Sequence, residues 1–323
     1  MIGGDDGGIV IGVDVGGTKM AVAALGERAV VTPTDCDGPE ELIAQIVRQV
    51  GAVAGGREVA AVGVGIPSVI EFETGRVRSS VNIPLADVPL REELTMRLGV
   101  PVFVDNDATL AALAEAHDEA GNLDAPNLVM LTVGTGVGGG IVIGGRVYRG
   151  ATGAAGELGH TLIAADPDAP ADPSFPKPGS LEALAAGHAL DALAREAAAR
   201  HPESALGRIG PTASGPDAVV AARAGDAVAI EVLATCGRRL GIGIANAINT
   251  FDPDVVAIGG GVSAAGELLL GPARETARDY VLPGVGTRTE TRIARSGPAA
   301  GVRGAALLAR IELTHHSGEA TPV

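Results

Sequence analysis

Residues 14–19 combine glycines and polar side chains that could hold the phosphates of a nucleotide; they read Asp14-Val15-Gly16-Gly17-Thr18-Lys19. Paired glycines let backbone N–H groups approach an anion, and Thr18 and Lys19 add a donor and a positive charge. Asp14 can hold a hydrated cation across the same phosphates. Apolar runs on both sides of the glycines predict a strand, a turn and a second strand over Ile9–Leu25.

A Gly-Gly pair is also what an ordinary hairpin uses, so this segment alone is weak evidence for a nucleotide site. It is not a P-loop, because Thr18-Lys19 reverses the Lys-Ser/Thr order and strand-like residues follow in place of a helix. The phosphate interpretation therefore needs a second site.

A second glycine-rich turn follows the apolar run Leu128–Val133 and reads Gly134-Thr135-Gly136-Val137-Gly138-Gly139-Gly140. Its spacing matches a dinucleotide fingerprint, but that fingerprint opens a helix, whereas Ile141–Ile143 and the glycines after it predict a hairpin. Two phosphate-facing hairpins about a hundred residues apart suggest two related half-domains that close on one nucleotide.

Two acidic segments lie on either side of the second turn. Asp107 lies where a short strand, 102–104, gives way to a helix, 108–119, and a carboxylate there is either a helix N-cap or a candidate proton acceptor for phosphoryl transfer. Glu157 and His160 are three residues apart, so in a helical turn they face the same way and can reach neighbouring hydroxyls of one sugar ring.

The order of these motifs resembles the ROK family of bacterial sugar kinases. The resemblance extends from Ile9 to Leu308 and rests on both glycine turns and on four further segments: Val104-Asp105-Asn106-Asp107-Ala108, Gly156-Glu157-Leu158-Gly159-His160, Gly259-Gly260-Gly261 and Gly304-Ala305-Ala306. It implies two actin-like (ribonuclease H-like) α/β domains with the sugar in an interdomain cleft, ATP and Mg²⁺ as cofactors, and a homodimer.

The resemblance also implies roles for individual residues. Asp107 would be the general base at the sugar hydroxyl, and Asp14 would hold Mg²⁺, through water. The sugar ligands would be Asn82, Asn106, Asp107, Glu157, His160 and Glu182. The nucleotide would be held by Asp14, Gly16, Gly17, Thr18, Lys19, Gly134, Thr135, Gly136, Gly259, Gly260 and Gly261.

One segment departs from the family pattern. Many ROK proteins follow the Gly-His pair with a cysteine-rich zinc loop, but residues 161–181 contain no cysteine. A structural zinc needs about four thiolate or imidazole ligands. The sequence therefore predicts no zinc and a loop stiffened by prolines.

Composition limits the classes of function. The chain has 323 residues, 46% of them apolar, with 39 acidic against 24 basic side chains and a net charge of −15, which argues against nucleic acid as a partner. No apolar run is long enough for a membrane helix, and residues 1–8 do not resemble a leader peptide, so we expect no membrane partner and a cytoplasmic protein. Aromatic residues are 2% and tryptophan is absent, so a sugar must be held by hydrogen bonds rather than by stacking.

The pattern of elements predicts a small N-terminal α/β domain, residues 1–117, and a larger C-terminal α/β domain, 118–302. A terminal helix over 303–314 would return to the first domain, and 315–323 would be a flexible tail.

The predicted activity is ATP-dependent transfer of a phosphoryl group to a primary hydroxyl, O6 of glucose or a related hexose. Alternative substrates are an amino-sugar such as kanosamine, or a cyclitol. Alternatives of other classes are a sugar-binding regulator without catalysis, a DNA-binding repressor and a glycosidase. The 13 residues before Asp14 are too few for a DNA-binding module, which argues against a repressor. The scarcity of aromatic residues for sugar subsites argues against a glycosidase.

Overall fold

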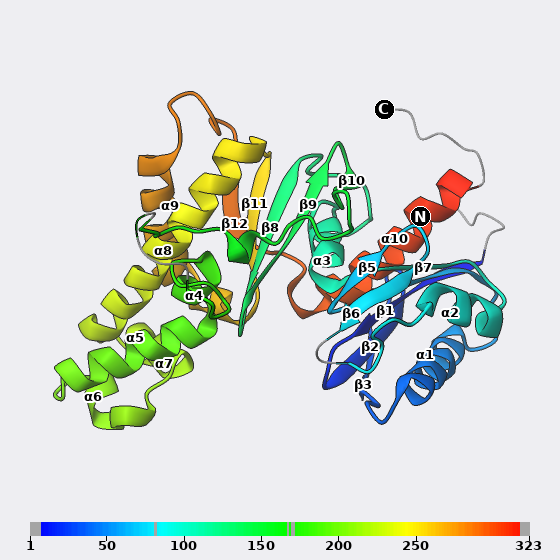
Figure 1. Ribbon diagram of the computed structural model, residues 1–323, viewed down its shortest axis with the longest axis horizontal. Coiled ribbons are helices and arrows are strands. Elements are labelled where there is room, and N and C mark those ends of the chain that lie inside the picture. Colours follow the sequence, from blue (N-terminus) through cyan, green and yellow to red (C-terminus); the bar gives the residue numbers. More distant parts are fainter. Residues whose placement is uncertain (1–7, 81–82, 167, 169–171, 317–323) are drawn as a thin grey trace. The chain divides into compact units, whose positions relative to one another are not determined.

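The computed structural model describes residues 8–80, 83–166, 168 and 172–316. The chain folds into two compact units (Figure 1). The first contains the described residues up to Pro126 together with Gly140–Ala155 and the segment from Ser296 onward, and the second contains Asn127–Gly139 and Gly156–Arg295. The sequence predicted one boundary near residue 117 and the return of a terminal helix. In the structure, residues 140–155 also belong to the first unit.

The first unit is built on a five-stranded sheet in the order β3-β2-β1-β4-β7. Strands β1 (Ile9–Val15), β2 (Lys19–Ala24) and β3 (Val30–Pro33) are antiparallel neighbours, whereas β4 (Val59–Ile66) and β7 (Val102–Asn106) run parallel to β1. The carboxyl ends of β1, β4 and β7 therefore meet at one edge of the sheet, where ligands of open α/β sheets are usually bound.

Alternation along β1 assigns its residues to two faces. Ile11, Val13 and Val15 are fully buried in a cluster with the apolar stripe of helix α1 (Pro39–Ala54). Gly12 faces helix α10 (Ala300–His316) instead, and a Cβ on Gly12 would lie 2.0 Å from the Val302 carbonyl oxygen. Figure 1 shows α1 and α10 on opposite sides of this sheet. Asp14 has the same parity as Gly12, so it lies on the α10 side.

Helix α2 (Leu90–Leu98) has the predicted bounds, but helix α3 (Asp107–Glu115) ends four residues before the predicted Glu119. Beyond the helix, the Asp118 carboxylate accepts from the backbone N–H and the side-chain amide of Asn122, at 2.8 and 3.0 Å. Sequence analysis did not predict the hairpin of β5 (Ser68–Glu71) and β6 (Arg76–Ser80), which forms a separate two-stranded sheet.

A second five-stranded sheet has the order β10-β9-β8-β11-β12. Strand β11 (Val255–Gly259) lies parallel to both β8 (Leu128–Val133) and β12 (Glu290–Ile293). Strand β9 (Val137–Ile143) begins earlier than predicted, because Val137 to Gly140 are strand residues rather than turn, and it pairs with β10 (Arg146–Val147).

The helices of the second unit form an alanine-rich core against this sheet. Their bounds are α4 (Leu181–Ala185), α5 (Gly187–Arg200), α6 (Ala205–Ile209), α7 (Gly215–Arg223), α8 (Ala227–Phe251) and α9 (Glu267–Tyr280). The alanine-rich segments 180–199 and 213–250 are each divided into two helices. The first breaks at Ala186, which is extended, and the second at Gly225, whose φ of +89° is outside the helical region. Within the described residues, no helix is both long and apolar enough to cross a bilayer.

Candidate active site

Asp14 lies near the carboxyl end of β1, on the face covered by α10. A Cβ on Gly301 of α10 would approach the Asp14 Oδ2 to 2.5 Å, so the glycine leaves room beside the carboxylate. Burial and, to a smaller extent, the negative charge of Asp107 together raise the pKa of Asp14 to about 6, against the opposing effect of Lys19. The first unit therefore brings Asp14 and Asp107 within electrostatic reach of one another.

The turn between β1 and β2 closes on itself. The Gly16 N–H donates to the Lys19 carbonyl at 2.9 Å, and the Thr34 hydroxyl donates to the Gly16 carbonyl at 2.6 Å. Thr18 and Lys19 are exposed at the tip. The Gly16 amide is therefore engaged within the turn, and a phosphate contact from this amide would require the turn to rearrange.

Asp107 is the first residue of α3, and Asn106 before it is the N-cap. The Asn106 Oδ1 accepts from the N–H groups of Ala108 and Thr109 at 2.9 and 3.2 Å, which satisfies two of the unpaired donors of the helix. The Asp107 Oδ1 accepts from Ala108 at 2.9 Å. Burial raises the pKa of Asp107, and the hydrogen bond from Ala108 opposes the rise.

The capping role limits what Asn106 can offer a sugar. Its Oδ1 already accepts two hydrogen bonds, and its Nδ2 donates to the Ser68 carbonyl at 3.3 Å. An amide nitrogen has two hydrogens, so Asn106 can donate one further bond. The predicted sugar ligand Asn82 lies outside the described residues.

The second unit gathers its glycine turns at the carboxyl ends of two adjacent parallel strands. Gly259 at the end of β11 is in register with Thr132 of β8, just before the turn that begins at Gly134. Gly260 has a φ of +81°, and a Cβ there would lie 2.3 Å from the Val133 carbonyl oxygen. The predicted nucleotide groups Gly134–Gly136 and Gly259–Gly261 are thus neighbours in this unit.

Helices α4 and α5 hold the turn at Gly134–Gly136. The Gly187 N–H donates to the Gly134 carbonyl at 2.7 Å, and the His188 Nδ1 lies 3.0 Å from the Thr135 carbonyl oxygen. Sequence analysis did not single out either residue, since nothing local marks a contact across more than fifty positions.

Glu182 of α4 also supports this turn. Its Oε2 accepts from the Val137 N–H at 2.8 Å, and a Cβ on Gly136 would come within 2.4 Å of the same oxygen. The resemblance had suggested Glu182 only as a sugar ligand. The structure places one of its oxygens against the glycine turn.

Glu157 and His160 form a close pair, as their spacing predicts. A short 3₁₀ helix, Leu158–His160, brings the His160 Nε2 to 3.6 Å from the Glu157 Oε2. The His160 ring also contacts Phe175, with ring centroids 4.7 Å apart. Within the described part of the chain, the His160 Nδ1 is buried and has no hydrogen-bond partner.

The segment that follows His160 is closed by backbone contacts. The N–H groups of Ile163 and Ala164 both donate to the Gly179 carbonyl, at 2.8 and 3.0 Å, and Leu162 and Ser180 form an antiparallel bridge. Among the described residues, no group of three or more His, Cys, Asp and Glu side chains could hold a metal ion.

Comparisons with known proteins match this arrangement. Residues 10–312 match the ROK family. A glucokinase of Halalkalibacterium halodurans is 37% identical over 315 residues, which are 93% of this chain and 94% of the relative. An N-acetyl-D-glucosamine kinase of Aliivibrio fischeri is 33% identical over 313 residues, 92% of this chain and 98% of the relative.

Among solved structures, a ROK family glucokinase from Streptomyces griseus in complex with glucose and AMPPNP aligns with a TM-score of 0.75 and 34% identity. The alignment covers 94% of this chain and 100% of the other. The predicted fold class, two actin-like α/β domains, is confirmed by this likeness. Family match, identity and coverage together show that the chain belongs to the ROK family.

Proposed function

We propose that this protein is an ATP-dependent hexose kinase that transfers the γ-phosphoryl group to O6 of glucose, with Asp107 as the general base. The observation that carries the proposal is the pairing of two partly buried carboxylates, Asp107 and Asp14, at the carboxyl edge of the first sheet. The similarity to glucokinases over nearly the whole chain supports the substrate.

Asp107 suits proton abstraction from an alcohol. Its carboxylate stands at the start of α3, while Asn106 satisfies the next two helix N–H groups, so capping does not explain why an acid is needed at 107. Burial raises its pKa, which makes the ionised carboxylate a stronger base near neutral pH. The proton of the sugar hydroxyl would pass to an Asp107 oxygen as the oxygen attacks the γ-phosphorus.

Asp14 suits a role toward Mg²⁺. Hard carboxylate oxygens are the ligands that Mg²⁺ takes, usually with several waters retained. The lack of a side chain at Gly301 lets the Asp14 carboxylate lie against α10 without a clash. When bound, the ion would neutralise charge on the ATP phosphates. Neutralisation would also relieve the repulsion between Asp14 and Asp107.

The nucleotide would be bound by Gly16–Lys19 and by the two adjacent glycine turns of the second unit. Glycine turns of this kind offer backbone N–H groups to phosphate oxygens. In the second unit Glu182 would fix the position of Val137, so that the turn keeps its shape when ATP leaves.

Glu157 and His160 would bind the sugar hydroxyls. Glu157 is exposed and His160 is partly exposed, and their polar atoms are only 3.6 Å apart, so they can reach adjacent hydroxyls of one ring. The second oxygen of Glu182 and the remaining donor of Asn106 would complete the set. A homodimer and a cytoplasmic location stay predictions.

An amino-sugar is the second candidate substrate, since an N-acetyl-D-glucosamine kinase also aligns over almost the full chain. Kanosamine-like sugars and cyclitols belong to the same test. Glucose and an amino-sugar differ at single ring positions.

A coupled ADP-release assay with glucose, mannose, N-acetylglucosamine, kanosamine and myo-inositol tests the proposal. We expect the highest kcat/KM with glucose and no turnover of 6-deoxyglucose, which lacks the attacked oxygen. Turnover of 6-deoxyglucose would contradict transfer to O6. Absence of ADP release with every sugar would favour a sugar-binding regulator, which equilibrium binding of glucose would then reveal.

A further inference from the structure

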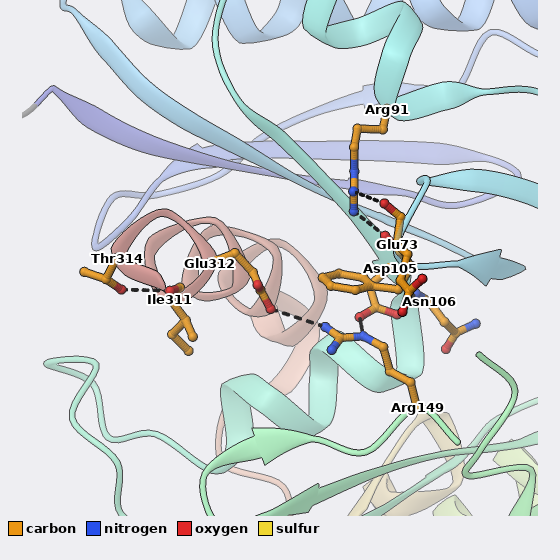
Figure 2. A network of polar contacts seen from close by, with 9 residues as sticks. Glu73, Arg91, Asp105, Asn106, Arg149, Ile311, Glu312 and Thr314 are labelled. Carbon is orange, nitrogen blue, oxygen red and sulfur yellow. Dashed lines mark hydrogen bonds and ion pairs between the residues drawn. The ribbon is translucent and has the colours of Figure 1, made fainter. Parts of the chain in front are cut away.

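A buried ion pair lies directly before the proposed base. Asp105 is 2% exposed, and its Oδ2 accepts a hydrogen bond from the Arg149 Nε at 2.8 Å. Its other oxygen, Oδ1, accepts from the Asn106 backbone N–H at 2.9 Å. Figure 2 shows Arg149 reaching Asp105 from a different element of the first unit. The carboxylate therefore joins Arg149 to the backbone of the residue next to Asp107.

Arg149 is itself held from two other sides. Its guanidinium carbon lies 3.3 Å from the ring centroid of Phe72, and its Nη2 lies 3.8 Å from the Glu312 Oε1 on α10. Arg91 fixes Phe72 in turn, because it donates to the carbonyls of Phe72 and Glu73. These contacts leave the guanidinium few alternative positions.

A gain in stability is a weak explanation of this arrangement. Removing charges from water is costly, so a buried ion pair is weak evidence for a gain in stability. Burial raises the pKa of Asp105, and Arg149 and the Asn106 N–H oppose the rise. A buried carboxylate that pairs with an arginine 44 positions away suits a task other than folding.

We propose that Arg149 is a positioning residue for phosphoryl transfer. By holding the Asp105 carboxylate in place, it fixes the Asn106 peptide at the end of β7 and thereby the direction in which α3 presents the Asp107 carboxylate. This inference rests on the proposed role of Asp107. Displacement of a catalytic base by about 1 Å lowers the rate about 10²-fold, so residues that hold the Asp107 carboxylate in position would have a large effect on turnover.

A cavity next to Arg149 makes the inference testable by chemical rescue. A space of about 520 Å³ is lined by the guanidinium together with Phe72, Arg146 and Glu312, among others. Truncation of Arg149 would open further space toward Asp105, large enough for a guanidinium ion. Arg146 lines the same cavity from an exposed position and provides a matched control.

The experiment compares Arg149→Ala with Arg146→Ala in the full-length enzyme. We expect kcat for the sugar to fall by about 10- to 100-fold in Arg149→Ala, while binding of a fluorescent ATP analogue stays within about twofold, because the nucleotide turns do not touch Arg149. Guanidinium or methylguanidinium at millimolar concentration should restore part of kcat, whereas urea at equal concentration should not. Arg146→Ala should retain the wild-type kcat.

A second comparison uses the Asp107→Asn background. If Arg149 acts through the base, Arg149→Ala should lower the residual turnover of Asp107→Asn by less than about twofold. Loss of the full factor in that background, or a kcat in Arg149→Ala that equals wild type, would overturn the inference. So would a loss that guanidinium does not restore while the variant melts at the wild-type temperature.

If Arg149→Ala does not fold, Arg149→Lys replaces it. Lysine keeps the charge but has neither the Nε donor nor the planar group that stacks on Phe72, so kcat should fall while the sugar KM changes little. Wild-type kcat in Arg149→Lys would refute the positioning role. Near-normal turnover in Asp107→Asn would instead refute the proposed base, which separates the two failures.

Discussion

Replacement of Asp14 by asparagine should make the protein more stable while it abolishes efficient catalysis. Asp14 is partly buried, faces the negative charge of Asp107 and has a pKa raised to about 6 from the usual 3.8. An ionised carboxylate in such a position lowers the stability of the fold. The proposed role of Asp14 toward Mg²⁺ nevertheless needs this charge. Asparagine has nearly the same shape and carries no charge at any pH.

The size of the effect follows from the pKa. The protonated carboxyl favours folding, and this contribution is complete below about pH 3.8 and is lost as the pH rises through about 6. The two pKa values differ by an amount worth about 3 kcal/mol, since one pKa unit equals about 1.36 kcal/mol. Some solvent screening at this partly buried side chain lowers the gain for Asp14→Asn to about 2 kcal/mol at pH 8 and about 1 kcal/mol at pH 5.

Urea unfolding followed by circular dichroism, with EDTA and without nucleotide, measures this gain as a shift in midpoint at unchanged slope. Asp37→Asn, at an exposed aspartate of the same unit, is the control and should leave the midpoint unchanged. A variant that is less stable than wild type at pH 8 would refute the reasoning. So would a gain of equal size at pH 5 and pH 8, because the cost of charge must vanish as Asp14 takes up its proton.

Further outcomes concern activity and metal content. Asp107→Asn should lower kcat by about 10² or more while glucose still binds in calorimetry, because the amide cannot accept the proton; near-normal kcat would remove Asp107 as the base. The acidic limb of kcat/KM for MgATP should lie near pH 6, where Asp14 protonates, and an unchanged rate down to pH 5 would count against Asp14 as the metal-facing group. Elemental analysis of the purified protein should find less than about one zinc per chain, and zinc-selective chelation should leave activity intact once Mg²⁺ is restored; stoichiometric zinc lost together with activity would reveal a ligand set that the sequence hides. Phe175→Ala should raise the glucose KM about threefold to tenfold through the lost contact with His160 while the ATP KM stays constant, and equal changes in both would point to general unfolding.

Local sequence determined most of the elements that carry the site. The apolar spacing at Leu42, Ile46 and Val50 predicts α1, and the structure buries all three. The β-branched runs on either side of Gly16 and before Gly134 predict the strands that end in the turns, because strand and turn preferences act within a few residues. The motif order then identified the family, since it combines several weak signals over almost the whole chain.

Contacts between distant residues could not be read from the sequence. Asn106 and Asp107 are adjacent polar residues, and either type can cap a helix. Which of them caps α3 depends on the direction of each side chain, which the sequence does not show. The contact of Glu182 with Val137 spans 45 positions, and that of Arg149 with Asp105 spans 44. Neither pair has a spacing that a helix or strand would impose.

The raised pKa values of Asp14 and Asp107 are likewise tertiary properties. Each aspartate has an ordinary pKa in an unfolded chain, and the rise appears only when α10 covers Asp14 and the ends of β1 and β7 come together around Gly65. The sequence by itself determined which residues can do the chemistry, because motif and residue type are local. Only the tertiary structure decided how strongly each carboxylate holds its proton and which arginine pairs with Asp105, because burial and Coulomb interactions depend on distance in space.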